Sequence, residues 1–161
     1  MSRILAIDFG LKRIGIAVTD TLQLIATALT TVESKDIINF LKDYLSKEQV
    51  ECIVIGKSVD LQNENNPIEI NIQSFIVDLK KFFPETKIDR FDERYTSKMA
   101  QQTILDSGIR KMERRNKALV DKISAVIILQ SYLEQIKKSN HGITHYWLWR
   151  SGVKKSGSRH R

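Results

Sequence analysis

The first twenty residues predict a β-hairpin whose first strand carries a carboxylate. Residues 3–9 form a short, mostly apolar run of the length of a buried strand, and Asp8 lies near its end. Gly10 and the polar step after it break the run, and residues 14–18 resume it as a second strand. A charge within an apolar strand is costly to bury unless something pairs with it. Asp8 is therefore either a cap for the turn at Gly10 or a ligand that the sheet presents to a metal ion or a phosphate.

The hydrophobic pattern of the remaining chain predicts a third strand and then alternating helices and strands. Residues 25–32 predict the third strand, and Ser34 is the expected N-cap of the helix that follows it. The apolar run at 50–55 is typical of a buried strand, and residues 87–91 predict another short one. Apolar residues at helical spacing predict helices over residues 34–47, 67–83, 96–108 and 118–137. We therefore expect an α/β fold with one mixed five-stranded sheet, three antiparallel strands and then parallel ones, flanked by helices.

The composition fits one soluble domain. The chain has 161 residues, of which 42% are hydrophobic and 28% charged, as is ordinary for a globular protein with a real core. No apolar run is long enough to span a bilayer and no signal-peptide pattern leads the chain, so we expect a cytoplasmic protein without a membrane partner. The single cysteine, Cys52, lies in an apolar run, which favours a buried structural thiol over a nucleophile and fits a reducing compartment.

The excess positive charge is confined to the C-terminal end of the chain. The net charge is +7, and residues 137–161 contain seven Lys or Arg and no Asp or Glu, so residues 1–136 balance to zero. All three His and both Trp fall in the same stretch. We therefore expect a domain over residues 1–137 and a basic, aromatic tail over 138–161 that is not a separate domain. Aromatic residues among cations suit a stacking surface for single-stranded nucleic acid, and they equally suit docking on an apolar groove or on a second chain.

Three carboxylates stand at positions where a sheet and a helix could bring them together. Asp8 lies in the first strand, Glu93 at the end of a parallel-type strand, and Asp121 near the start of the last helix. Sites in open sheets form beyond the carboxyl ends of strands, which suits Glu93. Small residues one turn after Asp121, Ser124 and Ala125, would let the helix approach the sheet closely. Carboxylates without His or Cys favour Mg²⁺ or Mn²⁺ over Zn²⁺, and two such ions form a clamp for phosphodiester cleavage, although caps or solvated charges would give the same pattern.

Basic residues near these carboxylates are candidates for binding a nucleic-acid backbone. Lys12 and Arg13 lie on the hairpin turn beside Asp8, where they either hold a phosphate or face solvent. Arg94 either reaches a phosphate or pairs with Asp92. A basic cluster precedes the last helix and comprises Arg110, Lys111, Arg114, Arg115 and Lys117. Such clusters neutralise backbone phosphates without reading sequence.

Four stretches carry a resemblance to a known family and cover roughly residues 3–136. They are Ala6–Gly10 with Arg13–Ala17, Ile53–Gly56, Asp92–Ser97, and Asp121–Ala125 running on to Gln130. In these motifs the sequence resembles the YqgF-type family, described as Holliday-junction-resolvase-like proteins and pre-16S rRNA nucleases with a ribonuclease H-like fold. The resemblance implies that Asp8, Glu93 and Asp121 form the metal-binding catalytic set.

The sequence departs from the family pattern in two places. Residues 57–66 contain neither the Pro step nor the Asn-x-Asp-Gly loop that usually follow the glycine at position 56, so no substrate contact is carried over to that loop. The tail beyond Lys137 exceeds the family's usual end.

These observations predict a metal-dependent endonuclease that hydrolyses phosphodiester bonds in structured RNA, with processing of the 5′ end of the 16S rRNA precursor as its role. The alternatives are a Holliday-junction resolvase that acts on four-way DNA and a nucleic-acid-binding module without catalysis. An ATP binder of the actin or sugar-kinase type would also carry the Asp8-Phe9-Gly10 step, but it needs a second glycine-rich phosphate loop that this short chain lacks. The sequence leaves open whether the protein is a monomer or a homodimer.

Overall fold

A single mixed β-sheet forms the centre of the protein. The computed structural model describes residues 1–58, 67–98, 101–102 and 117–150, and the side chains of 117–119 and 141–150 lie outside this description. The strands are β1 (Arg3–Asp8), β2 (Arg13–Thr19), β3 (Ala26–Glu33), β4 (Val50–Lys57) and β5 (Lys87–Asp92). Their order in the sheet is β3-β2-β1-β4-β5, with antiparallel pairing from β3 to β1 and parallel pairing from β1 to β5. The predicted mixed five-stranded sheet is thereby confirmed.

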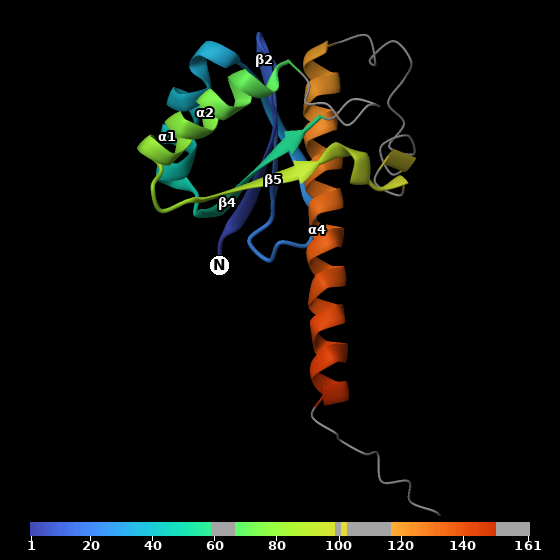
Figure 1. Cartoon of the computed structure of the whole chain (residues 1–161). Coiled ribbons are helices and arrows are strands. Elements are labelled where there is room, and N and C mark those ends of the chain that lie inside the picture. Colours follow the sequence, from blue (N-terminus) through green and yellow to red (C-terminus); the bar gives the residue numbers. More distant parts are fainter. Residues whose placement is uncertain (59–66, 99–100, 103–116, 151–161) are drawn as a thin grey trace, which may run out of the picture.

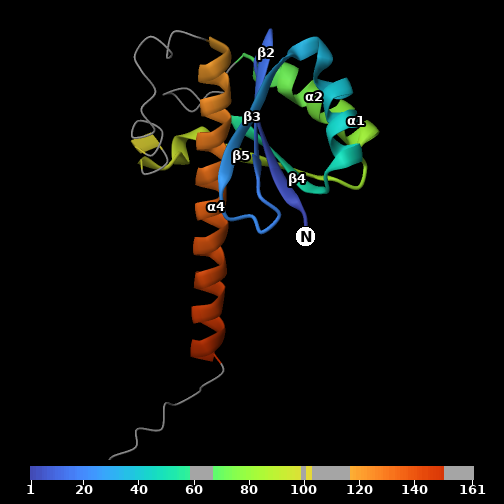
Figure 2. The same cartoon turned by 180° about the vertical axis from the view of Figure 1, so that it is seen from behind.

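Helices cover both faces of this sheet, as Figures 1 and 2 show. Helices α1 (Ile37–Lys47) and α2 (Glu69–Phe82) pack on one face, and the long helix α4 (Lys117–Arg150) crosses the other. Successive strand residues point to opposite faces, so each strand feeds two cores. Leu5, Ile7, Ile14, Ile16, Ile53 and Ile55 contact the α1 and α2 side, whereas Ile4, Ala6, Ala17, Cys52 and Val54 contact α4. Asp8 lies two and four residues after Ala6 and Ile4, so its side chain points to the same face of the sheet, the one that α4 covers. Cys52 is buried in this second core, as its apolar run predicts.

Helix α4 approaches the sheet closely because the residues between them are small. Ala6 and Ala17 on the sheet and Ala125 on the helix have no exposed surface. The closest approach is at Gly15 in β2, where an added Cβ would lie 2.0 Å from the backbone oxygen of Asp121 and 2.9 Å from the backbone nitrogen of Lys122. Only a residue without a side chain fits there, because the neighbour is helix backbone and cannot rotate away. Gly15 therefore sets the depth at which α4 packs.

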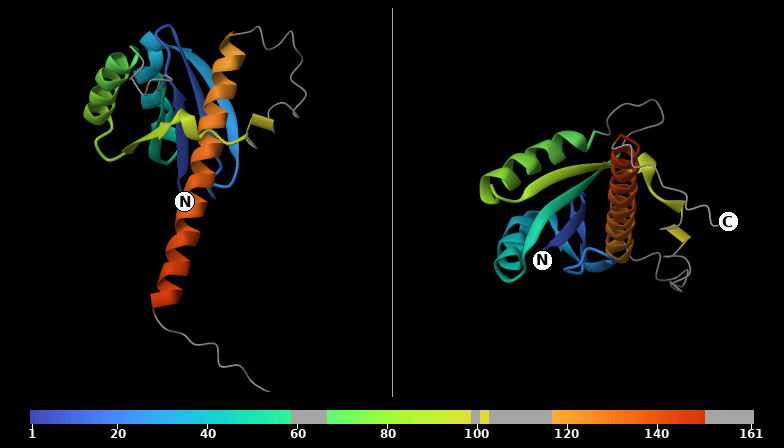
Figure 3. Two further views of the ribbon diagram at one scale, coloured as in Figure 1. Left: turned by 45° about the vertical axis from the view of Figure 1, so that its right-hand side comes forward. Right: turned by 90° about the horizontal axis from the view of Figure 1, so that it is seen from below.

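Helix α4 continues well beyond its predicted end. The spacing predicts a helix that stops near Lys137, but the helix extends to Arg150, and Figures 1 and 3 show its C-terminal part projecting past the sheet. Residues 138–150 contain no proline and a single glycine, so nothing in the local sequence terminates the helix. The first half of the predicted tail is thus helical. The division into a domain over 1–137 and a tail over 138–161 stays a prediction.

Two predicted helix starts are shifted in the structure. Ser34 is not an N-cap; it begins a short 3₁₀ helix (Ser34–Asp36), and its hydroxyl donates a 2.6 Å hydrogen bond to the carbonyl of Gly10. The side chain thus ties the connection after β3 to the β1–β2 turn, a tertiary partner that local spacing does not reveal. Helix α2 begins at Glu69, after Pro67 has formed a turn.

Part of the predicted third helix is described. Of the predicted helix over residues 96–108, residues 96 and 97 are not helical and residues 98, 101 and 102 are, whereas residues 99–100 and 103–108 lie outside the described residues. The same holds for residues 59–66 of the predicted loop. No helix in the described part of the chain is both long and apolar enough to cross a membrane.

We expect Gly15→Ala to destabilise the protein, because the added methyl group meets the α4 backbone. Overpacking of this kind costs about 3 kcal/mol of unfolding free energy. Thr27→Ile, at an exposed position of β3, also adds one methyl-sized group to the sheet and serves as the control. Urea unfolding of both variants measures the difference; equal stability of the two would contradict the close packing at Gly15.

Candidate active site

Two of the predicted carboxylates, Asp8 and Glu93, line one pocket beside α4. Asp8 is the last residue of β1, and Glu93 follows β5 directly as the first residue of a 3₁₀ turn (Glu93–Tyr95). The pocket has a volume of about 280 Å³. Its remaining lining residues are Thr96 and Gln101 from the segment after β5 and Ser124, Ile127 and Ile128 from α4. The site thus lies at the carboxyl ends of the parallel strands, where crossover connections leave room for a ligand.

A glycine in β4 makes room for the carboxylate of Glu93. A Cβ at Gly56 would lie 2.5 Å from Glu93 Oε1 and 2.7 Å from the terminal carbon of Ile128. The carboxylate therefore rests directly on bare strand backbone. Strand β4 is the parallel neighbour of β1, and Ile55 is paired with Ile7. Glu93 consequently reaches across β4 to the end of β1, where Asp8 stands.

The carboxylates repel one another, and burial strengthens the effect. The pKa of Asp8 is raised from 3.8 to about 7, first by burial and then by the charges of Glu93 and Asp121. The pKa of Glu93 is also raised, by burial and by the adjacent Asp92, against a smaller opposing effect of Arg90. No hydrogen bond between described residues reaches either carboxylate. The pair therefore holds negative charge in a partly desolvated place, which is the condition that favours a cation or a shared proton.

Asp121 reaches the site from α4 and is held by Arg13. Its backbone lies over Gly15, the residue paired with Asp8 in the β1–β2 ladder, so its charge acts on Asp8. Its carboxylate accepts a 3.3 Å hydrogen bond from Arg13 Nε at the start of β2. Within the described residues, no three His, Cys, Asp or Glu side chains lie close enough together to form a ready-made metal cage. The three predicted carboxylates thus lie near the C-terminal end of the central strand β1. Asp8 and Glu93 line one pocket, and Asp121 is bound to Arg13.

The predicted phosphate-binding residues have different environments. Lys12 is exposed on the β1–β2 turn. Together with Arg13 and Lys35 it lines a separate surface hollow of about 460 Å³. Arg94 is held by Asp92 through a 2.6 Å ion pair, the second of the two alternatives. The predicted cluster of Arg110, Lys111, Arg114 and Arg115 lies outside the described residues, as does the side chain of Lys117. The structure therefore brings Arg13 to a site carboxylate, that of Asp121, and leaves Lys12 exposed in the neighbouring hollow.

The sequence analysis missed a buried ion pair that supports the site from the other face. Glu69, at the start of α2, is only 8% exposed and binds Arg90 of β5 through both carboxylate oxygens. Arg90 also donates to the carbonyls of Ile55, at 3.2 Å, and Gly56, at 3.1 Å. The pair thus fixes the end of β4 beneath Glu93. The sequence carries one local signal of this network. Arg90 lies within strand β5, and its side chain points to the opposite face of the sheet from the buried Phe91.

Comparisons with known proteins agree in family. The model of the family described as "RuvX: Holliday junction resolvase" matches residues 2–135. A protein of Bacteroides thetaiotaomicron is 54% identical over 134 residues, which is 83% of this chain and 97% of that protein. One of Amoebophilus asiaticus is 49% identical over 138 residues, 86% of this chain and 98% of that protein. Both bear the name "Putative pre-16S rRNA nuclease".

Solved structures show the same fold at low sequence identity. The structure of T. thermophilus RuvC in complex with Holliday junction substrate matches with a TM-score of 0.54 at 12% identity, covering 84% of this chain and 96% of that one. A complex of the Fowlpox virus resolvase with Holliday junction DNA matches with a TM-score of 0.52 at 16% identity, covering 83% and 98%. The ribonuclease H-like fold that the sequence predicts is thereby confirmed.

The raised pKa of Asp8 predicts an unusual dependence of stability on pH. Between about pH 4 and pH 7 the folded state binds more protons than the unfolded state, so the free energy of unfolding falls as the pH rises through this range. Asp8→Asn removes this penalty. In EDTA at pH 8 it should stabilise the protein by up to about 4 kcal/mol, or roughly 10 °C in Tm, and near pH 4 it should change nothing.

Asp20→Asn is a control of opposite sign. The carboxylate of Asp20 accepts hydrogen bonds from the backbone amides of Leu22, Leu24 and Ile25, which lower its pKa. Its removal should therefore lower the Tm at pH 8. Thermal unfolding of both variants across this pH range checks the prediction, and a destabilised Asp8→Asn protein at pH 8 would refute it.

Proposed function

This chain belongs to the family described as RuvX, Holliday junction resolvase, and from that premise we propose that it is a divalent-metal-dependent endonuclease acting on structured RNA. The observation that carries the proposal is the buried pair Asp8 and Glu93, which lies on bare backbone at the carboxyl ends of the sheet. Two carboxylates that repel each other and lack a hydrogen-bonded partner among the described residues gain from a bound cation. The two carboxylates therefore favour the binding of a divalent cation.

The ligand chemistry of the site fits Mg²⁺ or Mn²⁺. Its candidate ligands are the carboxylates of Asp8, Glu93 and Asp121, and hard divalent cations prefer such oxygens. Each ion supplies a positive charge that lowers the pKa of an attacking water or stabilises the leaving oxygen. The carboxylate of Asp121 can bind a cation when it gives up its hydrogen bond with Arg13. That exchange frees the guanidinium of Arg13, next to the exposed Lys12, to bind the phosphate.

We assign 16S rRNA precursor as the substrate, with processing at its 5′ end. This assignment rests on relatives at about half identity over nearly their whole length, which bear the name of a pre-16S rRNA nuclease. We therefore also propose that the protein acts in the cytoplasm. Cleavage of a four-way DNA junction is the second candidate, favoured by the description of the family and by the DNA in the RuvC complex.

We expect the wild-type protein to cut labelled 16S rRNA precursor near its 5′ end in the presence of Mn²⁺ or Mg²⁺. Excess EDTA should abolish the cutting. Asp8→Asn and Asp121→Asn should each lower the rate at least about a hundredfold, because several kcal/mol of transition-state stabilisation is lost with a metal ligand. Gel analysis of end-labelled RNA measures the rate.

The same assay separates the competing functions. Asp43→Asn, an exposed carboxylate of α1 far from the site, is the matched control and should cut at the wild-type rate. A four-way DNA junction runs in parallel; cutting of the junction alone would assign the resolvase. Metal-dependent binding without cutting of either substrate would favour the binding module and overturn the nuclease.

Gly56→Ala should displace the carboxylate of Glu93 while changing the stability of the fold only slightly. The added methyl group meets the mobile ends of Glu93 and Ile128, which can move aside, so the loss of unfolding free energy should stay near 1 kcal/mol. The displaced carboxylate should lower the cleavage rate about tenfold and halve or abolish the rise in Tm that Mn²⁺ produces. An unchanged response of the Tm to Mn²⁺ would contradict the role of Glu93 as a ligand.

A further inference from the structure

A second pocket, of about 540 Å³, adjoins the candidate active site along α4. The 93–98 segment separates the two pockets, since Glu93 lines the first and Tyr95 lines the second. On α4, Ser124 lines the first pocket and Ser131 the second. Ser131 lies seven residues after Ser124, a rise of about 10 Å along the helix, which is the length of about three nucleotides in a stacked strand. A strand cut at the first pocket therefore reaches the second one within that distance.

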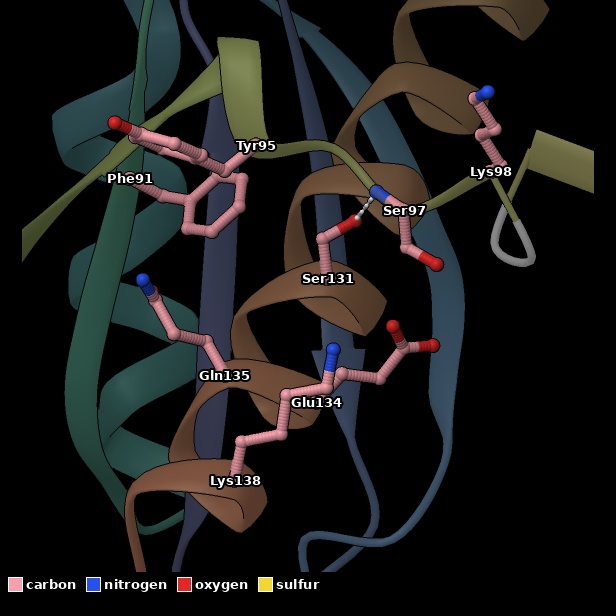
Figure 4. Close-up of a pocket in the computed structure, with 8 residues that line it drawn as sticks. All are labelled: Phe91, Tyr95, Ser97, Lys98, Ser131, Glu134, Gln135 and Lys138. Atoms are coloured by element: carbon pink, nitrogen blue, oxygen red, sulfur yellow. Dashed lines mark hydrogen bonds between the residues drawn. The ribbon is translucent and has the colours of Figure 1, made fainter. Parts of the chain in front are cut away.

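The walls of this pocket combine aromatic rings with polar groups, as Figure 4 shows. The rings of Phe91 and Tyr95 lie together on one side, and the amide of Gln135 reaches toward them from α4. The backbone nitrogen of Ser97 donates a 2.9 Å hydrogen bond to Ser131 Oγ, which joins the two walls at the middle of the pocket. The hollow is therefore a built feature that two elements hold together. Its volume is large enough for a nucleotide.

Tyr95 carries an exposed aromatic ring at the wall of the pocket. The residue is 66% exposed, so its ring is accessible to a ligand. The guanidinium of Arg94 lies 5.9 Å from the ring centre, and Asp92 anchors that guanidinium through a 2.6 Å ion pair. An exposed aromatic ring is the usual platform on which an unpaired base stacks.

The polar and charged groups of the pocket suit a base together with the phosphates beside it. Glu134 contributes a carboxylate on the Ser97 side of the pocket, which repels a phosphate there. Gln135 offers both a donor and an acceptor, and no hydrogen bond between described residues occupies its side-chain amide. Lys98 and Lys138 also line the pocket and are exposed, so they suit the phosphates on either side of the base.

We propose that this pocket binds an unpaired nucleobase of the substrate strand, one that carries an exocyclic amino group, within about three nucleotides of the cut. The base stacks on Tyr95 and presents its edge to the amide of Gln135, whose oxygen accepts a hydrogen bond from the exocyclic amino group. This inference rests on the proposed function, because the first pocket fixes the position of the strand. It adds a selection for where the enzyme cuts, since a paired base cannot enter.

The test is an abasic scan of the RNA around the cut. A set of precursor 5′-end RNAs, each with one nucleotide made abasic within four positions of the cut on either side, is offered to the wild type, Tyr95→Ala and Gln135→Ala. Cleavage with Mn²⁺ and binding by fluorescence anisotropy in EDTA are both measured. Phe82→Ala removes an exposed aromatic ring from α2, on the opposite face of the sheet, and is the matched control.

We expect one abasic position to weaken wild-type binding and cleavage about tenfold, the usual effect of losing one stacked base. Tyr95→Ala and Gln135→Ala should lose affinity for the intact RNA and become insensitive to that same position, whereas Phe82→Ala should behave as the wild type. A flat scan in the wild type, or full sensitivity retained in both pocket variants, would overturn the base pocket. Failure of the wild type to cut any RNA would instead count against the proposed nuclease, and the binding scan would still decide the role of the pocket.

Discussion

The close approach of α4 to β2 at Gly15 is the constraint on which the candidate site depends. The helix backbone at Asp121 lies where the side chain of residue 15 would otherwise be. Because Gly15 is paired with Asp8, this contact brings a carboxylate from the far end of the chain to the end of the central strand. The alanines further along the interface let the rest of the helix follow the sheet at the same depth. A larger residue at the contact would move the helix and the site together.

A second glycine acts by the same physical means on the other side of Asp8. Gly56 leaves space for the carboxylate of Glu93, and the Arg90–Glu69 pair fixes the strand that carries this glycine. The two supports differ in stiffness. At Gly15 the neighbour is helix backbone, whereas at Gly56 the neighbours are the ends of side chains. The protein thus fixes the helix rigidly and leaves Glu93 some freedom to adjust to a ligand.

The site stores electrostatic repulsion that the fold must tolerate. Burial and two neighbouring carboxylates raise the pKa of Asp8, and among the described residues only Asp121 has a cationic partner in direct contact, Arg13. Local rules that favour stability are broken here, which is typical of functional sites. The same short segment after β5 supplies Glu93 to one pocket and Tyr95 to the next. The proposed catalytic site and the proposed base pocket therefore share one short backbone segment.

The sequence by itself determined the strands, their antiparallel and then parallel arrangement, and the positions of Asp8, Glu93 and Asp121 along the chain. Alternation within strands, helical spacing and the order of elements are local properties, so they can be read without knowing the fold. Tertiary structure decided which residues meet across large separations. Three contacts join segments that lie far apart in the sequence and that the hydrophobic pattern does not connect. They are the bond between Arg13 and Asp121, the network of Glu69 and Arg90, and the contact of Gly15 with α4. Even the end of α4 was misjudged, because a change in composition near Lys137 does not terminate a helix in the absence of a residue that breaks it.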